Sequence, residues 1–117
     1  MTNIESFTHT SMAIIRIYRN TVTFNGRATS LLVPRPAKRI RFLLSDSGLL
    51  YVGGTESRDG IFPTRRKGRK GVEINSRSLC ERLLEETGGC ETLRVREDRY
   101  TFDNGETCYL VERLGRQ

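Results

Sequence analysis

The sequence predicts an α+β fold, with a mostly antiparallel sheet of seven or eight short strands and one principal helix at about residues 76–87. Short runs rich in β-branched and aromatic residues recur along the chain and are separated by turn signals. One longer stretch has helical periodicity and ends at paired glycines. The length of 117 residues, of which 36% are hydrophobic, indicates one domain, which we assign to residues 12–117.

The first strand follows a segment that has no periodic pattern. Residues 1–11 are polar, and we expect them to form a disordered leader. Residues 13–19 are rich in isoleucine and predict a strand whose odd-numbered apolar residues face the core, with Arg16 on the opposite side. Asn20 then allows a tight reversal into a second strand at residues 21–24.

A turn is expected at Asn25-Gly26, because both residue types tolerate positive φ. Residues 27–33 follow with apolar side chains at helical spacing, which predicts a short helix that ends at Pro34. A strand that begins at Leu32 is the alternative for this segment.

Two hairpins are expected in the middle of the chain. The first joins strands at residues 38–45 and 49–53 through the turn 46–48, and its four leucines predict that it lies in the core. The second joins strands at residues 60–63 and 72–75. Its connection, residues 64–71, is a run with five cationic residues and two glycines, which we call the basic tip.

The principal helix has the clearest local signals. Ser78 has capping-box spacing to Glu81, and Asn75 or Ser76 is the alternative cap. Gly88 supplies the left-handed end. The side chains expected on its buried stripe are Leu79, Cys80, Leu83 and Leu84. Ion pairs at i,i+4 are expected between Arg77 and Glu81 and between Arg82 and Glu86.

The last part of the chain predicts strands again. Residues 91–96 alternate apolar and charged side chains, and residues 100–102 and 107–112 flank the hairpin signal at residues 103–105. Asp98 and Asp103 are both expected at turns, where aspartate is favoured for conformational reasons.

The cysteines and the single histidine argue against a cofactor. Cys80, Cys90 and Cys108 are an odd number without a C-x-x-C pair, so a zinc site would need all three together with His9. We therefore predict buried free thiols, no metal and no cofactor. Free thiols and the absence of an apolar signal core predict a cytoplasmic protein. No apolar run is long enough to span a membrane, so we expect no membrane partner.

Enzymatic activity is not expected. The only histidine lies in the predicted leader, which argues against a Ser-His or Cys-His nucleophile pair. The sequence contains no Gly-Lys dipeptide, which excludes a Walker A loop. The adjacent Glu85 and Glu86 are interpreted as a solvated helix face.

Positive charge is concentrated in the first two-thirds of the chain. The formal net charge is +6, with +9 in residues 1–78 and −3 in residues 79–117. The basic residues are seventeen arginines and three lysines, and the planar guanidinium group suits phosphate and guanine edges. An arginine-rich codon usage is the alternative explanation.

These charges predict a small nucleic-acid-binding protein, largely non-specific in sequence, with DNA favoured over RNA. The basic tip and a second cluster at residues 35–41 both lie at strand ends, so one continuous stripe is conceivable. Tyr18, Tyr51 and Phe62 are candidates for base stacking, although core positions are favoured for Tyr51 and Phe62. The candidate binding residues are Arg35, Lys38, Arg39, Arg41, Arg65, Arg66, Lys67, Arg69 and Lys70.

The alternative is a protein-interaction or accessory module of the kind found in phages and mobile elements. The basic tip would then contact an acidic protein partner or maintain solubility. The two classes differ in how strongly any binding depends on salt.

Residues 21–53 resemble the core unit of the AbrB-like swapped-hairpin transition-state regulators. The matching parts are the expected strand at 22–24, the short helix at 28–32 and the strand–turn–strand at 38–44 and 49–52. In that family two chains interlace into a DNA-binding dimer, so the resemblance implies a homodimer. The family's Ile-Pro is replaced here by Phe24-Asn25 and its Gly-Asp turn by Pro36-Ala37, and no site residue is transferred from it.

Overall fold

A computed structural model describes residues 12–33, 38–66 and 68–114 of the chain. Within these residues, eight antiparallel strands form one curled sheet accompanied by two helices, which confirms the predicted α+β fold. The strand order is β3-β4-β8-β7-β1-β2-β6-β5. The strands are β1 (Ala13–Ile17), β2 (Thr21–Phe24), β3 (Arg39–Leu44), β4 (Leu50–Thr55), β5 (Thr64–Arg65), β6 (Val72–Asn75), β7 (Thr92–Thr101) and β8 (Thr107–Arg113), and the helices are α2 (Gly26–Leu32) and α3 (Arg77–Glu86). The expected leader, residues 1–11, lies outside the described residues.

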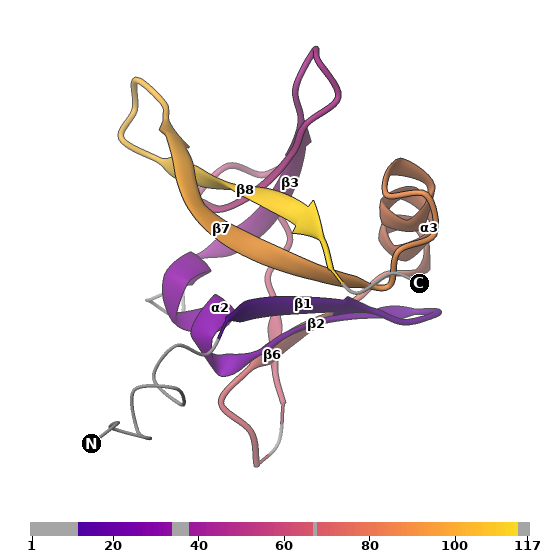
Figure 1. Ribbon diagram of the computed structural model, residues 1–117. Helices are drawn as coiled ribbons and strands as arrows, with labels where there is room; N and C mark the ends of the chain where they lie inside the picture. The colour runs from indigo at the N-terminus through magenta and orange to yellow at the C-terminus, as the bar shows by residue number, and fades with distance from the viewer. Residues whose placement is uncertain (1–11, 34–37, 67, 115–117) are drawn as a thin grey trace, which may run out of the picture.

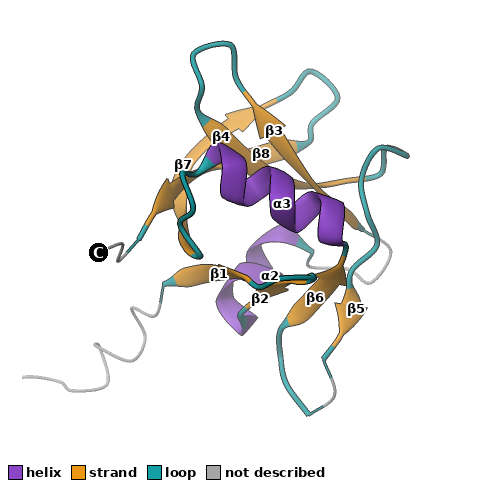
Figure 2. Ribbon diagram, turned by 90° about the vertical axis from the view of Figure 1, so that its right-hand side faces the viewer, coloured by secondary structure: helices purple, strands orange, loops and turns teal. Residues whose placement is uncertain are grey.

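The sheet curls so that its two halves face each other. Figure 1 shows β1, β2 and β6 on one side and β3, β7 and β8 on the other, with the two helices at different ends of the intervening space. Figure 2 shows α3 crossing between these halves. The backbone of Ile61 forms two hydrogen bonds of 2.8 Å with Ile40 of β3, just before the chain enters β5. This bridge links the two ends of the strand order.

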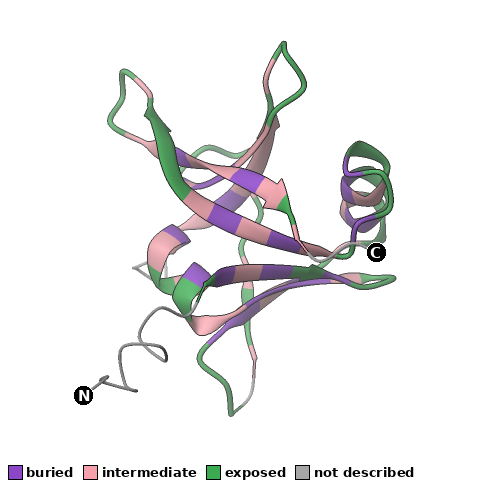
Figure 3. Ribbon diagram, viewed as in Figure 1, coloured by how far each residue is buried: buried purple, intermediate pink, exposed green. Residues whose placement is uncertain are grey.

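Apolar side chains at alternate positions of the strands fill the space inside the curled sheet. Ala13, Ile15 and Ile17 of β1 are buried as predicted, and Arg16 is exposed on the other face. Figure 3 shows buried segments on strands of both halves of the sheet. The core also includes Val22, Phe24, Ile40, Val52, Ile74, Leu93 and Val95 from other strands. Burial of each large apolar side chain contributes about 1.5–3 kcal/mol relative to exposure.

The predicted turn at Asn25-Gly26 is instead the start of α2. Asn25 is the N-cap with an extended backbone, φ −70°, and its Oδ1 accepts hydrogen bonds from the Ala28 and Ile14 amides at 2.9 and 3.1 Å. Its Nδ2 donates to the carbonyl oxygen of Met12 at 2.9 Å. The short-helix prediction is therefore confirmed, and the alternative strand start at Leu32 is wrong. Pro34, its expected end, lies outside the described residues.

The principal helix, α3, is confirmed with the alternative cap. Ser76 rather than Ser78 is the N-cap, and its Oγ accepts from the Leu79 amide at 3.2 Å. Gly88 has a φ of 70°, which is the left-handed conformation that favours glycine. The buried stripe consists of Cys80 and Leu83 flanked by the half-buried Leu79 and Leu84. The expected ion pairs have N–O distances of 3.1 Å for Arg77 with Glu81 and 2.9 Å for Arg82 with Glu86.

The leucines of the β3–β4 hairpin do not lie in the core as predicted. Leu44 and Leu49 are exposed, and Leu43 and Leu50 are half-buried. The reason is tertiary: β8 pairs with β4 only from Tyr51 to Gly53, so the turn end of the hairpin has no third strand beside it. In Figure 1 this turn projects beyond the rest of the sheet.

Two other predicted boundaries are wrong. The strand expected at residues 60–63 is limited to a bridge at Ile61, and regular pairing starts only at Thr64. Phe62, expected in the core, is 54% exposed. β7 continues through Asp98, expected at a turn, because an irregularity between Val95 and Arg99 absorbs the register shift against the long β8.

Candidate nucleic-acid interface

The basic tip closes the β5–β6 hairpin, as the charge run predicts. The Arg66 amide donates to the carbonyl oxygen of Gly71 at 3.3 Å, and the Arg69 amide donates to that of Arg66 at 3.0 Å. Gly68 has a φ of 71°, which a side-chain-bearing residue rarely adopts. Figure 1 shows this hairpin projecting on the opposite side of the molecule from the β3–β4 and β7–β8 turns.

The base of the tip is fixed to the junction of β2 and α2. Gly71 is buried, and a Cβ atom at this position would overlap the carbonyl oxygen of Phe24. The Val72 amide donates to Thr29 Oγ1 at 3.2 Å, and the same hydroxyl donates to Phe24 O at 3.3 Å. These contacts fix the base of the basic tip. Its described cationic side chains are mostly exposed.

Next to the tip, the outer face of β1 and β2 forms a cavity of about 250 Å³, which we call the arginine hollow. The alternation that buries Ile15 and Ile17 places their neighbours on this outer face. Only β2 lies between β1 and β6 in the sheet, so the loop that precedes β6 lies near β1. The residues lining the hollow are Ile14, Arg16, Tyr18, Thr23, Asn25, Arg66 and Arg69.

The guanidinium groups of Arg16, Arg66 and Arg69 line the arginine hollow. The carboxylate of Glu73 partly offsets the charge of Arg66. Arg66 Nε lies 3.6 Å from Oε1 of Glu73, which is paired across the sheet with Thr23. Within the described residues, Arg16 and Arg69 form no ion pair, and both are exposed. The hollow therefore keeps an excess of positive charge that an anion can neutralise.

The described cations of the second cluster, Lys38, Arg39 and Arg41, are already in contact with protein groups. Lys38 Nζ lies 3.6 Å from Oε2 of Glu56. The guanidinium carbon of Arg39 lies 4.4 Å from the centre of the Phe62 ring, a cation–π contact. Phe62 is thus exposed, and its ring contacts Arg39.

Arg41 is a largely enclosed cation. Its side chain is 18% exposed and lies between two carboxylates, with N–O distances of 3.4 Å to Asp59 and 3.4 Å to Glu106. The Glu56 amide, the Thr55 hydroxyl and Arg41 all stabilise the charged form of Glu106 and hold its pKa below the usual value. Arg41 therefore links the loop between β4 and β5, through Asp59, to Glu106 in the turn before β8.

The structure brings some of the nine candidate residues together and separates others. Arg66 and Arg69 meet at the arginine hollow, while Arg65 and Lys70 are exposed on the same hairpin. Lys38, Arg39 and Arg41 belong to the β3 end of the sheet, and Arg35 and Lys67 lie outside the described residues.

Sequence reasoning did not include Arg16 among the candidate residues, although it lines the arginine hollow. Its outward orientation on the first strand was predicted, but its proximity to the basic tip depends on pairing between β1, β2 and β6. Tyr18, which was considered for stacking, lines the same hollow. The available signal was an arginine and a tyrosine at alternate positions on the outer face of one strand.

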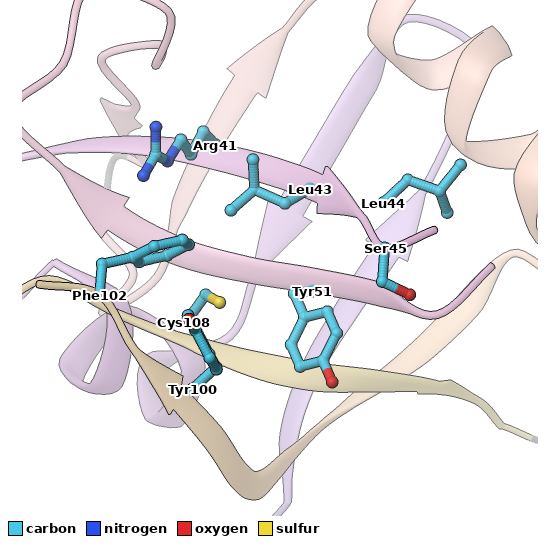
Figure 4. Close-up of a pocket in the computed structure, with 8 residues that line it drawn as sticks. All are labelled: Arg41, Leu43, Leu44, Ser45, Tyr51, Tyr100, Phe102 and Cys108. Carbon is cyan, nitrogen blue, oxygen red and sulfur yellow. The ribbon is translucent and has the colours of Figure 1, made fainter. Parts of the chain in front are cut away.

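A second cavity of about 410 Å³, the apolar pocket, lies between the β3–β4 and β7–β8 hairpins. Figure 4 shows Tyr51 of β4, Tyr100 of β7, Cys108 of β8 and Phe102, which follows β7. Tyr100 is 57% exposed and contacts Phe102 edge-on, with 5.0 Å between the ring centres. Tyr51, expected in the core, is half-buried here. The lining residues are Arg41, Leu43, Leu44, Ser45, Tyr51, Tyr100, Phe102 and Cys108.

The three cysteines are buried free thiols, as predicted. Burial raises the pKa of the Cys80 and Cys108 thiols, which keeps them protonated at neutral pH. In the part of the chain that the structure describes, no three histidine, cysteine, aspartate or glutamate residues gather as metal ligands do. Among the same residues, no helix has the length and apolar character needed to cross a membrane.

Comparison with known proteins gave no match: no protein-family model, no curated protein and no solved structure matches this chain. The resemblance of residues 21–53 to the AbrB-like regulators therefore stays a prediction.

Proposed function

We propose that this protein binds nucleic acid, with DNA favoured over RNA, and holds it mainly through phosphate contacts. The observation that carries the proposal is the arginine hollow, where Arg16 of β1 lines the same cavity as Arg66 and Arg69 of the basic tip. A guanidinium group donates paired hydrogen bonds in a planar fork that fits phosphate oxygens. Arg65 and Lys70 extend the positive surface along the hairpin.

Binding of this kind has little sequence preference, because phosphate contacts carry no base identity. We do not expect α3 to act as a recognition helix in a groove of duplex DNA. Its solvent side bears Glu81, Glu85 and Glu86, and phosphates would be repelled by these carboxylates. The contact surface is therefore assigned to the hairpin and the outer face of β1 and β2.

The test is a fluorescence-anisotropy titration of labelled DNA over a range of salt concentrations. If Arg16, Arg65, Arg66, Arg69 and Lys70 each neutralise one phosphate, log Kd depends on log salt with a slope of magnitude about 4–5. The triple variant Arg16→Gln, Arg66→Gln, Arg69→Gln should reduce that magnitude by about 2–3 units. The loss should be similar on unrelated DNA sequences.

A matched control separates the hollow from net charge. The triple variant Arg58→Gln, Arg77→Gln, Arg82→Gln removes the same charge from exposed positions elsewhere. It should keep nearly the slope of the wild-type protein. Absence of binding by the wild-type protein at low salt, or an equal loss of slope in both triple variants, contradicts the proposal.

A protein-interaction module is the second candidate function. The observation that favours it is the apolar pocket, since contiguous exposed apolar surface marks contact sites. An apolar side chain of a partner protein is the occupant that this lining suits. Binding there would depend weakly on salt, in contrast to phosphate binding. This candidate leads if the wild-type protein fails to bind DNA at low salt.

A further inference from the structure

We infer that the arginine hollow takes single-stranded nucleic acid, with a phosphate between its arginines and the adjacent base stacked on Tyr18. The inference rests on the proposed function and specifies the form of nucleic acid that the site accepts. Three features of the hollow carry it: the exposure of the Tyr18 ring, its spacing from Arg16, and the hydrogen bonds that already occupy Asn25.

The main chain of Tyr18 is held in position, and its side chain is open to solvent. Its amide donates to the carbonyl oxygen of Thr21 at 2.8 Å, which closes the turn between β1 and β2. The residue is nevertheless 53% exposed, and within the described residues its ring has no aromatic or cationic stacking partner. A fixed main chain with a free ring face is the arrangement that base-stacking platforms use.

The end of β1 places an aromatic ring, that of Tyr18, near a group that can bind phosphate, the guanidinium group of Arg16. Tyr18 follows the end of β1, two residues after Arg16, and both side chains line the hollow on the outer face of the sheet. Two residues span about 7 Å in an extended chain. Consecutive positions of this face therefore offer a guanidinium group and then an aromatic ring. One nucleotide presents the same two elements, its phosphate and its base.

The strand state follows from what stacking requires. In a duplex both faces of each base are covered by its neighbours, so Tyr18 would have to separate a base step at a cost of a few kcal/mol. An unpaired base has no such cost, and its face is available to the ring. Tyr18 lines the arginine hollow and is mostly exposed, so an unpaired base can reach its ring.

Besides the arginines, which are assigned here to phosphate, Asn25 is the residue of the hollow that resembles a reader of base edges, and it is already engaged. Its Oδ1 accepts from the Ile14 and Ala28 amides, and its Nδ2 donates to Met12 O. Moving it toward a base would uncap α2 and release the start of β1. The stacked base should therefore be held by its face, with little preference for its identity.

The experiment compares three probes of equal length by fluorescence anisotropy at one low salt concentration. They are an oligothymidine strand, an abasic strand with the same phosphates but no bases, and a mixed-sequence duplex. An oligouridine strand is measured beside them, so that DNA and RNA sources of the same chemistry are distinguished. The wild-type protein should bind the oligothymidine strand about tenfold more tightly than the abasic strand.

Substitutions at Tyr18 give the decisive comparison. Tyr18→Ala should lower affinity for the oligothymidine strand about tenfold and leave affinity for the abasic strand unchanged, while Tyr18→Phe should retain wild-type binding. Tyr100→Ala, at an equally exposed tyrosine of the apolar pocket, is the matched control and should change neither affinity. Circular dichroism confirms that each variant is folded.

The two proposals fail in different ways. If the wild-type protein binds none of the probes, the proposed function is wrong and this inference falls with it. If the wild-type protein prefers the duplex, or Tyr18→Ala weakens binding to the thymidine and abasic strands equally, base stacking is excluded. Phosphate binding by the arginine hollow then stands without it.

Discussion

Arg66 Nε and Glu73 Oε1 lie 3.6 Å apart at the edge of the arginine hollow, with both side chains partly exposed. The carboxylate orients one of the three arginines and also offsets its charge. Exposed or partly exposed ion pairs contribute little to stability, at about 0.2–1 kcal/mol. The effect of Glu73 on an incoming phosphate should therefore exceed its effect on folding.

Replacing Glu73 by glutamine should strengthen DNA binding. The change releases Arg66 and removes one negative charge from the hollow, so affinity at low salt should rise about two- to fivefold. Anisotropy titrations measure this directly. Glu85→Gln makes the same charge change on α3, where the carboxylate is exposed, and should leave affinity nearly unaltered. An equal gain in both variants would mean that only net charge matters.

Gly71→Ala should destabilise the protein, because it disturbs the packing that attaches the base of the basic tip to β2. A Cβ at this buried position would overlap Phe24 O, so the root of the hairpin must move at a cost of about 3 kcal/mol. Gly68→Ala is the comparison, since it has open space around it and a positive φ that costs about 1 kcal/mol. Urea unfolding measures both. A Gly71→Ala cost no greater than that of Gly68→Ala would contradict the packing described for this root.

Glu106→Gln should reduce stability at neutral pH and flatten its acid dependence. Glu106 accepts from the Glu56 amide, the Thr55 hydroxyl and Arg41, at 3.0, 2.8 and 3.4 Å. Loss of the charged acceptor should cost about 1.5–3 kcal/mol at pH 7. Glu85→Gln, on an exposed helix face, should cost much less.

The sign of the pH effect follows from the lowered pKa of Glu106. The stabilisation is fully present above the ordinary glutamate pKa and is lost as the pH falls through the lower value in the folded protein. The difference in unfolding free energy between wild type and Glu106→Gln should therefore shrink progressively below about pH 4. A difference that stays constant down to pH 2 would show that the charge of Glu106 is not what stabilises the loop.

Much of the secondary structure could be predicted because its signals are local. The α3 stripe, its ion pairs and its glycine end lie within thirteen residues of one another, and propensity alone places them. The hairpin turns before Leu49 and Thr107 are encoded in the same way by short glycine-containing runs. The errors occur where distant segments decide the outcome. Asn25 caps a helix instead of forming a turn, and its side chain is held by the backbone of Met12 and Ile14.

The charges of the basic tip were evident in the sequence by itself, and so was the outward face of Arg16. Only the tertiary structure decided which cations converge and which are neutralised. Arg41 meets Glu106, which is 65 residues away, and Arg16 meets Arg66 because β2 and β6 pair beside β1. Strand partners are selected by burial of the whole core, and no short window of sequence contains that information.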